Sequence, residues 1–261
     1  MRHTSPRFRT ALATAALLIA SAPAAQAGGC KAYANQRFVF LLQGQVRSAD
    51  GLSDVGKSIL GRLVFDASGT AGSFTLMNNG GDPLSHGQEQ GSFSCLATRQ
   101  LSGLAQQLNL SNGLAMLAVR ERGAVQLLAQ MPQTAMNGEA RPAANWDALP
   151  HGACDLLPGK AYIGRYGAES DGVAAMGLAQ WRFDTRVFSM QNWAAYSTAS
   201  AAVPLDRTLS ACAPTTPDQV AVLSVNDGID GYLMAYPSAD GSVAWIHTYP
   251  GRGVGGWMRP R

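Results

Sequence analysis

The feature that most constrains the fold of this chain is an internal repeat. A series of landmarks occurs twice in the same order, at offsets between 115 and 124 residues. The paired landmarks are Cys30 and Cys154, Phe38 and Tyr162, Asp66 and Asp184, Cys95 and Cys212, Asn112-Gly113 and Asp227-Gly228, and Gly123–Pro132 and Gly241–Pro250. Chance readily supplies one such match, whereas the ordered set predicts that the chain is two copies of one module.

Each copy has the alternating pattern of β-strands. Phe38, Phe40 and Leu42 lie on one face of residues 37–43, at the period of two that a strand requires. The Asn-Gly and Asp-Gly pairs of the repeat favour hairpin turns, because both central residues of a type I′ turn need positive φ. We expect seven or eight short strands per copy. Because closure hides the edges of a hairpin meander, the predicted fold class is all-β, with two tandem small antiparallel β-barrels or barrel-like sandwiches.

The first residues have the pattern of a secretory signal peptide, predicted over residues 1–27. Residues 1–10 contain three arginines and no acid, residues 11–21 form an apolar run, and Ala25-Gln26-Ala27 is a small-residue cleavage site. The apolar run is shorter than the roughly 20 residues that span a bilayer. We therefore predict an exported chain, periplasmic or extracellular, without a transmembrane segment.

Composition predicts the remaining boundaries. Residues 28–132 are expected to form the first β module and residues 151–250 the second. Residues 133–150 contain several Ala and Asn and two Pro without clear alternation, so they are expected to be a linker. Residues 251–261 hold five glycines or prolines before the final arginine and are expected to be a flexible tail.

Removal of the signal peptide balances the charge of the chain. The formal net charge is +3, but Arg2, Arg7 and Arg9 lie in the predicted signal, which leaves 17 basic residues against 17 acidic ones. A neutral chain has no general electrostatic attraction to nucleic acid. No nucleic-acid partner is therefore predicted.

Three motifs of the first copy carry a family resemblance. They are the aromatic strand Phe38–Gly44, the strand end Phe65-Asp66 with Gly69 three residues on, and Gly91-Ser-Phe-Ser-Cys95. Their order resembles a small secreted bacterial β-barrel module that is similar to the lipocalin-like (calycin) barrels. The resemblance implies a barrel and hardly constrains function, because such barrels bind many unrelated ligands. The second copy departs from it, since Asp184 has no following Gly.

Four cysteines in an exported chain indicate disulfides. Three pairings are possible, and the repeat favours Cys30–Cys95 and Cys154–Cys212, because these pairs occupy equivalent places. Cys30 has one alternative interpretation, as the lipid-anchored cysteine of a lipoprotein, although Ala27 stands where such signals prefer a larger aliphatic residue. The cysteine spacing fits neither a redox pair nor a zinc site, so no metal is predicted.

The candidate site residues are the large aromatic residues of the second copy. Trp245, His247 and Tyr249 share one face of a predicted strand, and Trp181 and Phe183 share a face of another. Trp193 follows in the next segment. If these faces line a barrel, they form an aromatic ligand site with one titratable group at His247. The alternative is that the same residues are core or surface.

These patterns lead to three functional hypotheses. The first is a non-enzymatic exported barrel that binds a small apolar or aromatic ligand, or a partner in the cell envelope. The second is an enzyme of the cyclase, isomerase or hydrolase type with His247 as acid or base. The third is a structural or adhesive envelope protein. No cofactor is predicted, because the chain has no nucleophile elbow, calcium loop or glycine-rich phosphate loop. The oligomeric state stays open.

Overall fold

The computed structural model describes most of the chain after the predicted signal peptide. The described residues are 29–47, 54–79, 88–98, 104–132, 134–170, 173–184, 188–197, 205–209, 212–214, 218, 220–226, 232–249 and 252–261. The predicted signal peptide over residues 1–27 and the predicted Asp227-Gly228 turn lie outside them. The described residues are dominated by antiparallel strands, which confirms the all-β fold class.

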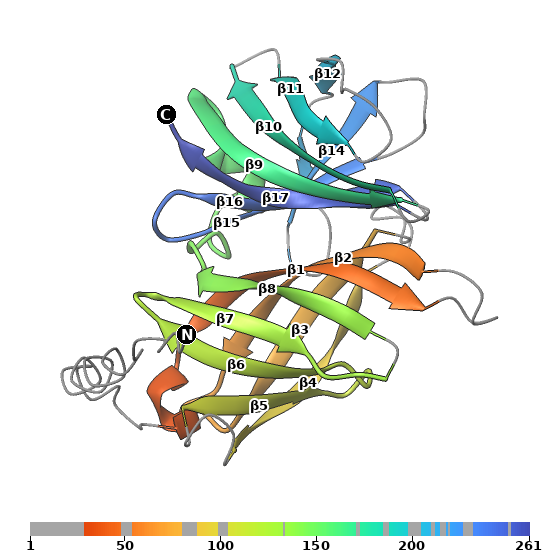
Figure 1. Cartoon of the computed structure of the whole chain (residues 1–261). Coiled ribbons are helices and arrows are strands. Elements are labelled where there is room, and N and C mark those ends of the chain that lie inside the picture. Colours follow the sequence, from red (N-terminus) through yellow and green to blue (C-terminus); the bar gives the residue numbers. More distant parts are fainter. Residues whose placement is uncertain are drawn as a thin grey trace, which may run out of the picture.

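The first half forms a closed eight-stranded antiparallel barrel, in which each strand pairs with the next and the last pairs with the first (Figure 1). The strands are β1 (Arg37–Arg47), β2 (Asp54–Phe65), β3 (Ala71–Asn78), β4 (Glu89–Ala97), β5 (Ala105–Leu110), β6 (Ala115–Glu121), β7 (Ala124–Ala129) and β8 (Thr134–Pro142), preceded by the 3-10 helix η1 (Gly29–Tyr33). Phe38, Phe40 and Leu42, predicted on one strand face, all belong to the buried interior of this first barrel. Phe65 and Phe74, from the next two strands, pack with them.

The second half forms a nine-stranded sheet. Its strands are β9 (Lys160–Ser170), β10 (Val173–Phe183), β11 (Phe188–Ser197), β12 (Leu205–Leu209), β13 (Ala213–Pro214), β14 (Ala221–Asn226), β15 (Tyr232–Pro237), β16 (Val243–Tyr249) and β17 (Arg252–Pro260), preceded by the 3-10 helix η3 (Gly152–Leu156). β17 returns to pair with β9, and β12 also pairs with β14. The strand pairings therefore form a circuit of eight strands that starts and ends at β9 and passes directly from β12 to β14. The short strand β13 pairs only with β14 among the strands that the structure describes.

The two halves share a hydrophobic core. Val39 and Leu41 of β1 and Leu60 of β2 point away from the barrel interior, yet each is at most 3% exposed. They pack in one cluster with the second sheet, including Met234 and Ile246. Figure 1 shows β15, β16 and β17 lying next to β1 and β2. The second sheet thus covers one outer face of the first barrel.

The expected linker is wrong over its first half. Residues 134–142 form β8, which pairs with β1 and β7 and closes the first barrel. The pattern is weak because only Met136 and Ala140 are buried apolar residues of this strand. Between them Gly138 approaches β1 so closely that a Cβ there would lie 1.8 Å from the Leu41 carbonyl oxygen. Gly138 therefore marks a close approach of two paired backbones within a strand.

The expected flexible tail is also wrong. Residues 252–260 form β17, which pairs with β16 and β9 in the second sheet. Its glycines again mark close contact: a Cβ at Gly253 would lie 2.6 Å from the Lys57 backbone nitrogen of β2. The glycines of β17 therefore allow it to pack closely against the first barrel, and they do not indicate a flexible tail.

Candidate functional site

The 3-10 helix η1 places one aromatic side chain in the end of the first barrel. Cys30 is bonded to Cys95 of β4, with 5.8 Å between the two Cα atoms, which fixes η1 against the barrel wall. Gly69 has φ +71° and allows this approach, since a Cβ there would lie 2.4 Å from the Cys30 carbonyl oxygen. Three residues after Cys30, Tyr33 is 2% exposed. We call Gly29–Tyr33 the Tyr33 cap.

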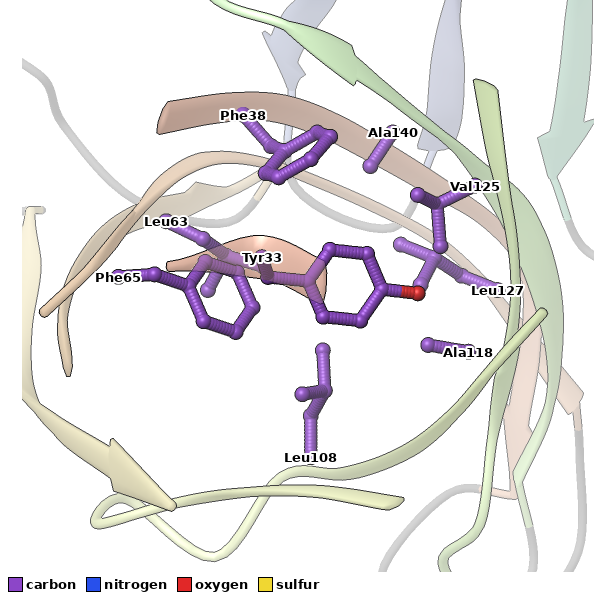
Figure 2. Close-up of a pocket in the computed structure, with 9 residues that line it drawn as sticks. All are labelled: Tyr33, Phe38, Leu63, Phe65, Leu108, Ala118, Val125, Leu127 and Ala140. Atoms are coloured by element: carbon purple, nitrogen blue, oxygen red, sulfur yellow. The ribbon is translucent and has the colours of Figure 1, made fainter. Parts of the chain in front are cut away.

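Around the Tyr33 ring lies a small apolar cavity. Its volume is about 10 Å³, room for about one water molecule. Figure 2 shows the Tyr33 ring inside the barrel, with Phe65 beside it and Ala118 near its hydroxyl end. The lining residues are Tyr33, Phe38, Leu63, Phe65, Leu108, Ala118, Val125, Leu127 and Ala140. None of them carries a charge, so the cavity suits an uncharged apolar occupant.

The polar contact at this cavity is made by the Tyr33 hydroxyl. It donates a hydrogen bond of 2.9 Å to the Gln106 side-chain oxygen, and both groups are buried. The ring stacks on Phe65 at 5.0 Å between centroids and meets Phe38 edge-on at 5.7 Å. The Arg120 guanidinium lies 5.9 Å from the ring centroid. Burial raises the pKa of Tyr33, and the nearby Arg120 charge opposes this in part.

The structure brings three of the predicted site residues together in the second sheet. Trp181 lies 5.7 Å from Phe183 and 5.1 Å from Trp245 between ring centroids, and all three are at most 2% exposed. Tyr162 lies opposite Trp181 in the register of β9 and β10. These rings pack against one another as core. A ligand-lining role for them stays a prediction.

The other predicted site residues lie on neighbouring strands. His247 is half-buried in β16, with Leu233 and Val254 as its cross-strand neighbours. Tyr249 ends β16, and Trp193 lies opposite Leu178 in the pairing of β11 with β10. The side chains of Trp193 and Tyr249 are outside the described part of the structure.

Both predicted disulfides are confirmed. Cys30–Cys95 joins η1 to β4, and Cys154–Cys212 joins η3 to the residue directly before β13. Each bridge therefore ties the 3-10 helix that opens one half of the chain to the middle of that half. The described residues contain no free cysteine.

Alkaline pH is expected to destabilise the protein through Tyr162. Burial raises the pKa of Tyr162 from its ordinary value of 10.0 to about 12. Because burial favours the neutral tyrosine, the folded protein holds this proton more tightly than the unfolded chain. The resulting contribution to stability, about 3 kcal/mol, is complete below pH 10 and is lost as the pH rises to about 12. Unfolding free energies measured in urea across this range should fall more steeply for the wild type than for Tyr162→Phe. Equal slopes would show that other groups cause the alkaline loss.

A buried ionic cluster joins the two halves. Arg62 of β2 contacts Asp147 through two hydrogen bonds of 2.8 and 2.9 Å, and Asp218 through one of 2.7 Å. Trp146 lies beneath the guanidinium at 4.7 Å and donates a 2.9 Å hydrogen bond to the Asp218 carbonyl oxygen. Burial raises the pKa of Asp218, while the hydrogen bond from Arg62 lowers that of Asp147. We call Arg62, Trp146, Asp147 and Asp218 the interface cluster.

Sequence reasoning missed Tyr33 and Gln106. Tyr33 lies in a 3-10 turn, where no period of two or 3.6 marks a buried side chain. Gln106 is a polar residue of β5 that is only 6% exposed. The one sequence signal was position: Tyr33 follows Cys30 by three residues, as the fully buried Leu157 follows Cys154.

The described residues contain no group of three His, Cys, Asp or Glu side chains placed to hold a metal ion. Across the same residues, every helix is too short or too polar to cross a membrane.

Solved structures that resemble this chain weakly include the following two proteins. Kievitone hydratase from Nectria haematococca is 9% identical, with 88% of this chain and 90% of that chain covered, at a TM-score of 0.29. A candidate AttH protein from Nitrosomonas europaea is 10% identical, with 87% and 94% covered, at a TM-score of 0.25. These TM-scores are too low to support an argument about function. No protein-family model matches the chain, and no curated protein matches it.

Proposed function

We propose that the mature chain is an exported, non-enzymatic protein that binds a small apolar or aromatic molecule inside its first barrel. The observation that carries this proposal is the uncharged cavity around Tyr33, enclosed by a closed barrel. Ligand sites are typically concave and apolar with few polar groups, and the mouths of β-barrels are a common place for them.

Binding requires movement of the Tyr33 ring. A cavity of about 10 Å³ admits no organic molecule as it stands. Rotation of the Tyr33 side chain out of the barrel would add the volume of a phenol ring to it. Ala118 and Ala140 are small residues on the barrel wall, so the enlarged space would not be blocked from that side. The Cys30–Cys95 bridge would keep the Tyr33 cap attached while the ring leaves.

Export is supported by the two disulfides, because such bonds form and persist in oxidising compartments. The predicted signal peptide over residues 1–27 agrees with this. Both observations support the proposal that binding takes place in the periplasm or outside the cell.

We also propose that the two halves arose by duplication of one lipocalin-like module. Both halves begin with a 3-10 helix that carries a disulfide cysteine. The strand registers support the same alignment as the sequence: Leu63 lies opposite Phe38 in the first barrel, and Trp181 lies opposite Tyr162 in the second sheet.

Filling the cavity is expected to weaken ligand binding. The probes are 2-naphthol and 2-methylnaphthalene, which are small, aromatic and fluorescent, and we expect the wild type to bind at least one. Ala118→Leu adds three carbons to the wall of the cavity and should weaken that binding at least about tenfold. Fluorescence titration of the folded proteins, checked by circular dichroism, measures the change.

The matched control is Leu128→Ala on the neighbouring strand β7. Its side chain is 50% exposed and points away from the barrel interior, so this variant should bind like the wild type. Binding that survives Ala118→Leu would place the ligand elsewhere and contradict the proposed site.

A further inference from the structure

We infer that the ligand of the first barrel carries a phenolic ring, whose hydroxyl takes the place of the Tyr33 hydroxyl as the donor to Gln106. This inference rests on the proposed binding function and adds the chemical class of the ligand. In the structure, the Tyr33 ring occupies the place that we assign to the ring of the ligand.

The orientation of Gln106 makes its buried end an acceptor. The side-chain nitrogen of Gln106 donates to the Leu104 carbonyl oxygen at 3.1 Å. A carbonyl oxygen only accepts hydrogen bonds, so the amide oxygen of Gln106 must point toward the Tyr33 hydroxyl, 2.9 Å away. When Tyr33 leaves, this buried oxygen loses its donor. A ligand with a hydroxyl at that place satisfies it again, whereas a hydrocarbon leaves it unpaired.

The surroundings of the ring select a flat aromatic group. Phe65 stacks on one face of the Tyr33 ring with 30° between the planes, and Phe38 meets it at 83°. These two arrangements are the ones that aromatic pairs prefer. The Arg120 guanidinium at 5.9 Å adds a cation–π contact. A phenolic ligand in the place of Tyr33 would keep all three contacts.

The position in the second half that corresponds to Tyr33 carries no hydroxyl. In the second half, the position three residues after the first cysteine is Leu157, which is fully buried and has no polar group. A purely apolar side chain is therefore sufficient at that place in this chain. The Tyr33–Gln106 hydrogen bond is an added feature of the first barrel, and phenol recognition explains it.

The site takes the neutral phenol. A phenolate has no proton to donate to Gln106, and burial disfavours its charge, as it does for Tyr33, whose pKa is raised. Affinity for a phenolic ligand should therefore fall as the pH rises through the pKa of the free ligand.

The test compares 2-naphthol with 2-methylnaphthalene, which differ by a hydroxyl in place of a methyl group. We expect the wild type to bind 2-naphthol at least about tenfold more tightly. Gln106→Met keeps a side chain of similar length but removes the acceptor, so it should abolish this preference. Tyr33→Phe keeps the cap aromatic but removes its hydrogen bond, so it should raise the affinity for 2-naphthol several-fold.

The possible outcomes separate failure of the phenolic inference from failure of the proposed binding function. Equal binding of both probes, lost in Ala118→Leu, would overturn the phenolic inference and keep the binding function. A preference for 2-naphthol that persists in Gln106→Met would also overturn the inference, because the hydroxyl would then be bound elsewhere. Failure of the wild type to bind either probe would overturn both, and Tyr33 would be a core residue only.

Discussion

Replacing Arg62 with methionine is expected to destabilise the folded protein by about 3–5 kcal/mol. Arg62 is 5% exposed and neutralises Asp147 and Asp218 at the contact between the two halves. Methionine fills a similar volume but leaves the Asp218 carboxylate, whose side chain is only 8% exposed, without a cation. The cost is that of a buried unpaired charge, which greatly exceeds the cost of a lost surface ion pair. Urea-unfolding titrations of the two proteins measure it.

The pH dependence of this loss has a definite sign. Burial raises the pKa of Asp218, and removal of Arg62 would raise it further. A carboxyl group with a raised folded-state pKa is favoured in the folded protein when it is protonated. The loss of unfolding free energy in Arg62→Met should therefore be smaller near pH 4, where the Asp218 carboxyl is more protonated, than near pH 7.

Arg37→Met is the matched control. Arg37 contacts the same Asp147, but its side chain is 43% exposed, so solvent screens the interaction. Its replacement should cost no more than about 1 kcal/mol. Equal losses in the two variants would mean that Arg62 does not neutralise a buried charge.

The second large effect is expected for Trp181→Ala, a loss of about 3–5 kcal/mol. Trp181 is fully buried, and its ring packs on Phe183 and Trp245. Truncation to alanine removes an indole from the core of the second sheet and leaves a cavity that the surrounding strands fill only in part. Thermal and urea unfolding of the two proteins measure the loss.

Leu178→Ala, on the same strand β10, is the control for Trp181→Ala. Leu178 is 48% exposed, so its replacement should change stability by no more than about 0.5 kcal/mol. A loss below about 1 kcal/mol for Trp181→Ala would speak against tight packing. It would favour the original prediction that Trp181 lines a ligand site.

Much of the fold was predictable from local patterns. The alternation of Phe38, Phe40 and Leu42 correctly identified the inward face of β1, because a strand repeats every two residues. The disulfide pairing was predictable because the two cysteine pairs have similar spacings along the chain, 65 and 58 residues apart.

The failures share one physical cause, which is contact between distant segments. Residues 134–142 were expected to belong to a linker and residues 252–260 to a flexible tail, yet their glycines allow close approach to β1 and β2. The burial of Val39 and Leu41 on the outer face of β1 has the same origin. The unbroken apolar run Phe38–Leu42 could have indicated a strand buried on both faces. It could not indicate which surface covers the second face.

The sequence by itself determined the all-β fold class, the inward face of β1 and the two cysteine pairs. Strand alternation acts over a few residues, and the cysteine pairs were found by comparing spacings along the chain. Only the tertiary structure decided that the second sheet covers the first barrel, that Arg62 joins two carboxylates across that contact, and that Tyr33 enters the barrel to meet Gln106. These three features depend on side chains 73 to 156 residues apart in the chain or on the packing of whole sheets. Closure of the first barrel brings Tyr33 to Gln106, and packing of the second half against β1 and β2 brings Arg62 to Asp218. No local pattern encodes either arrangement.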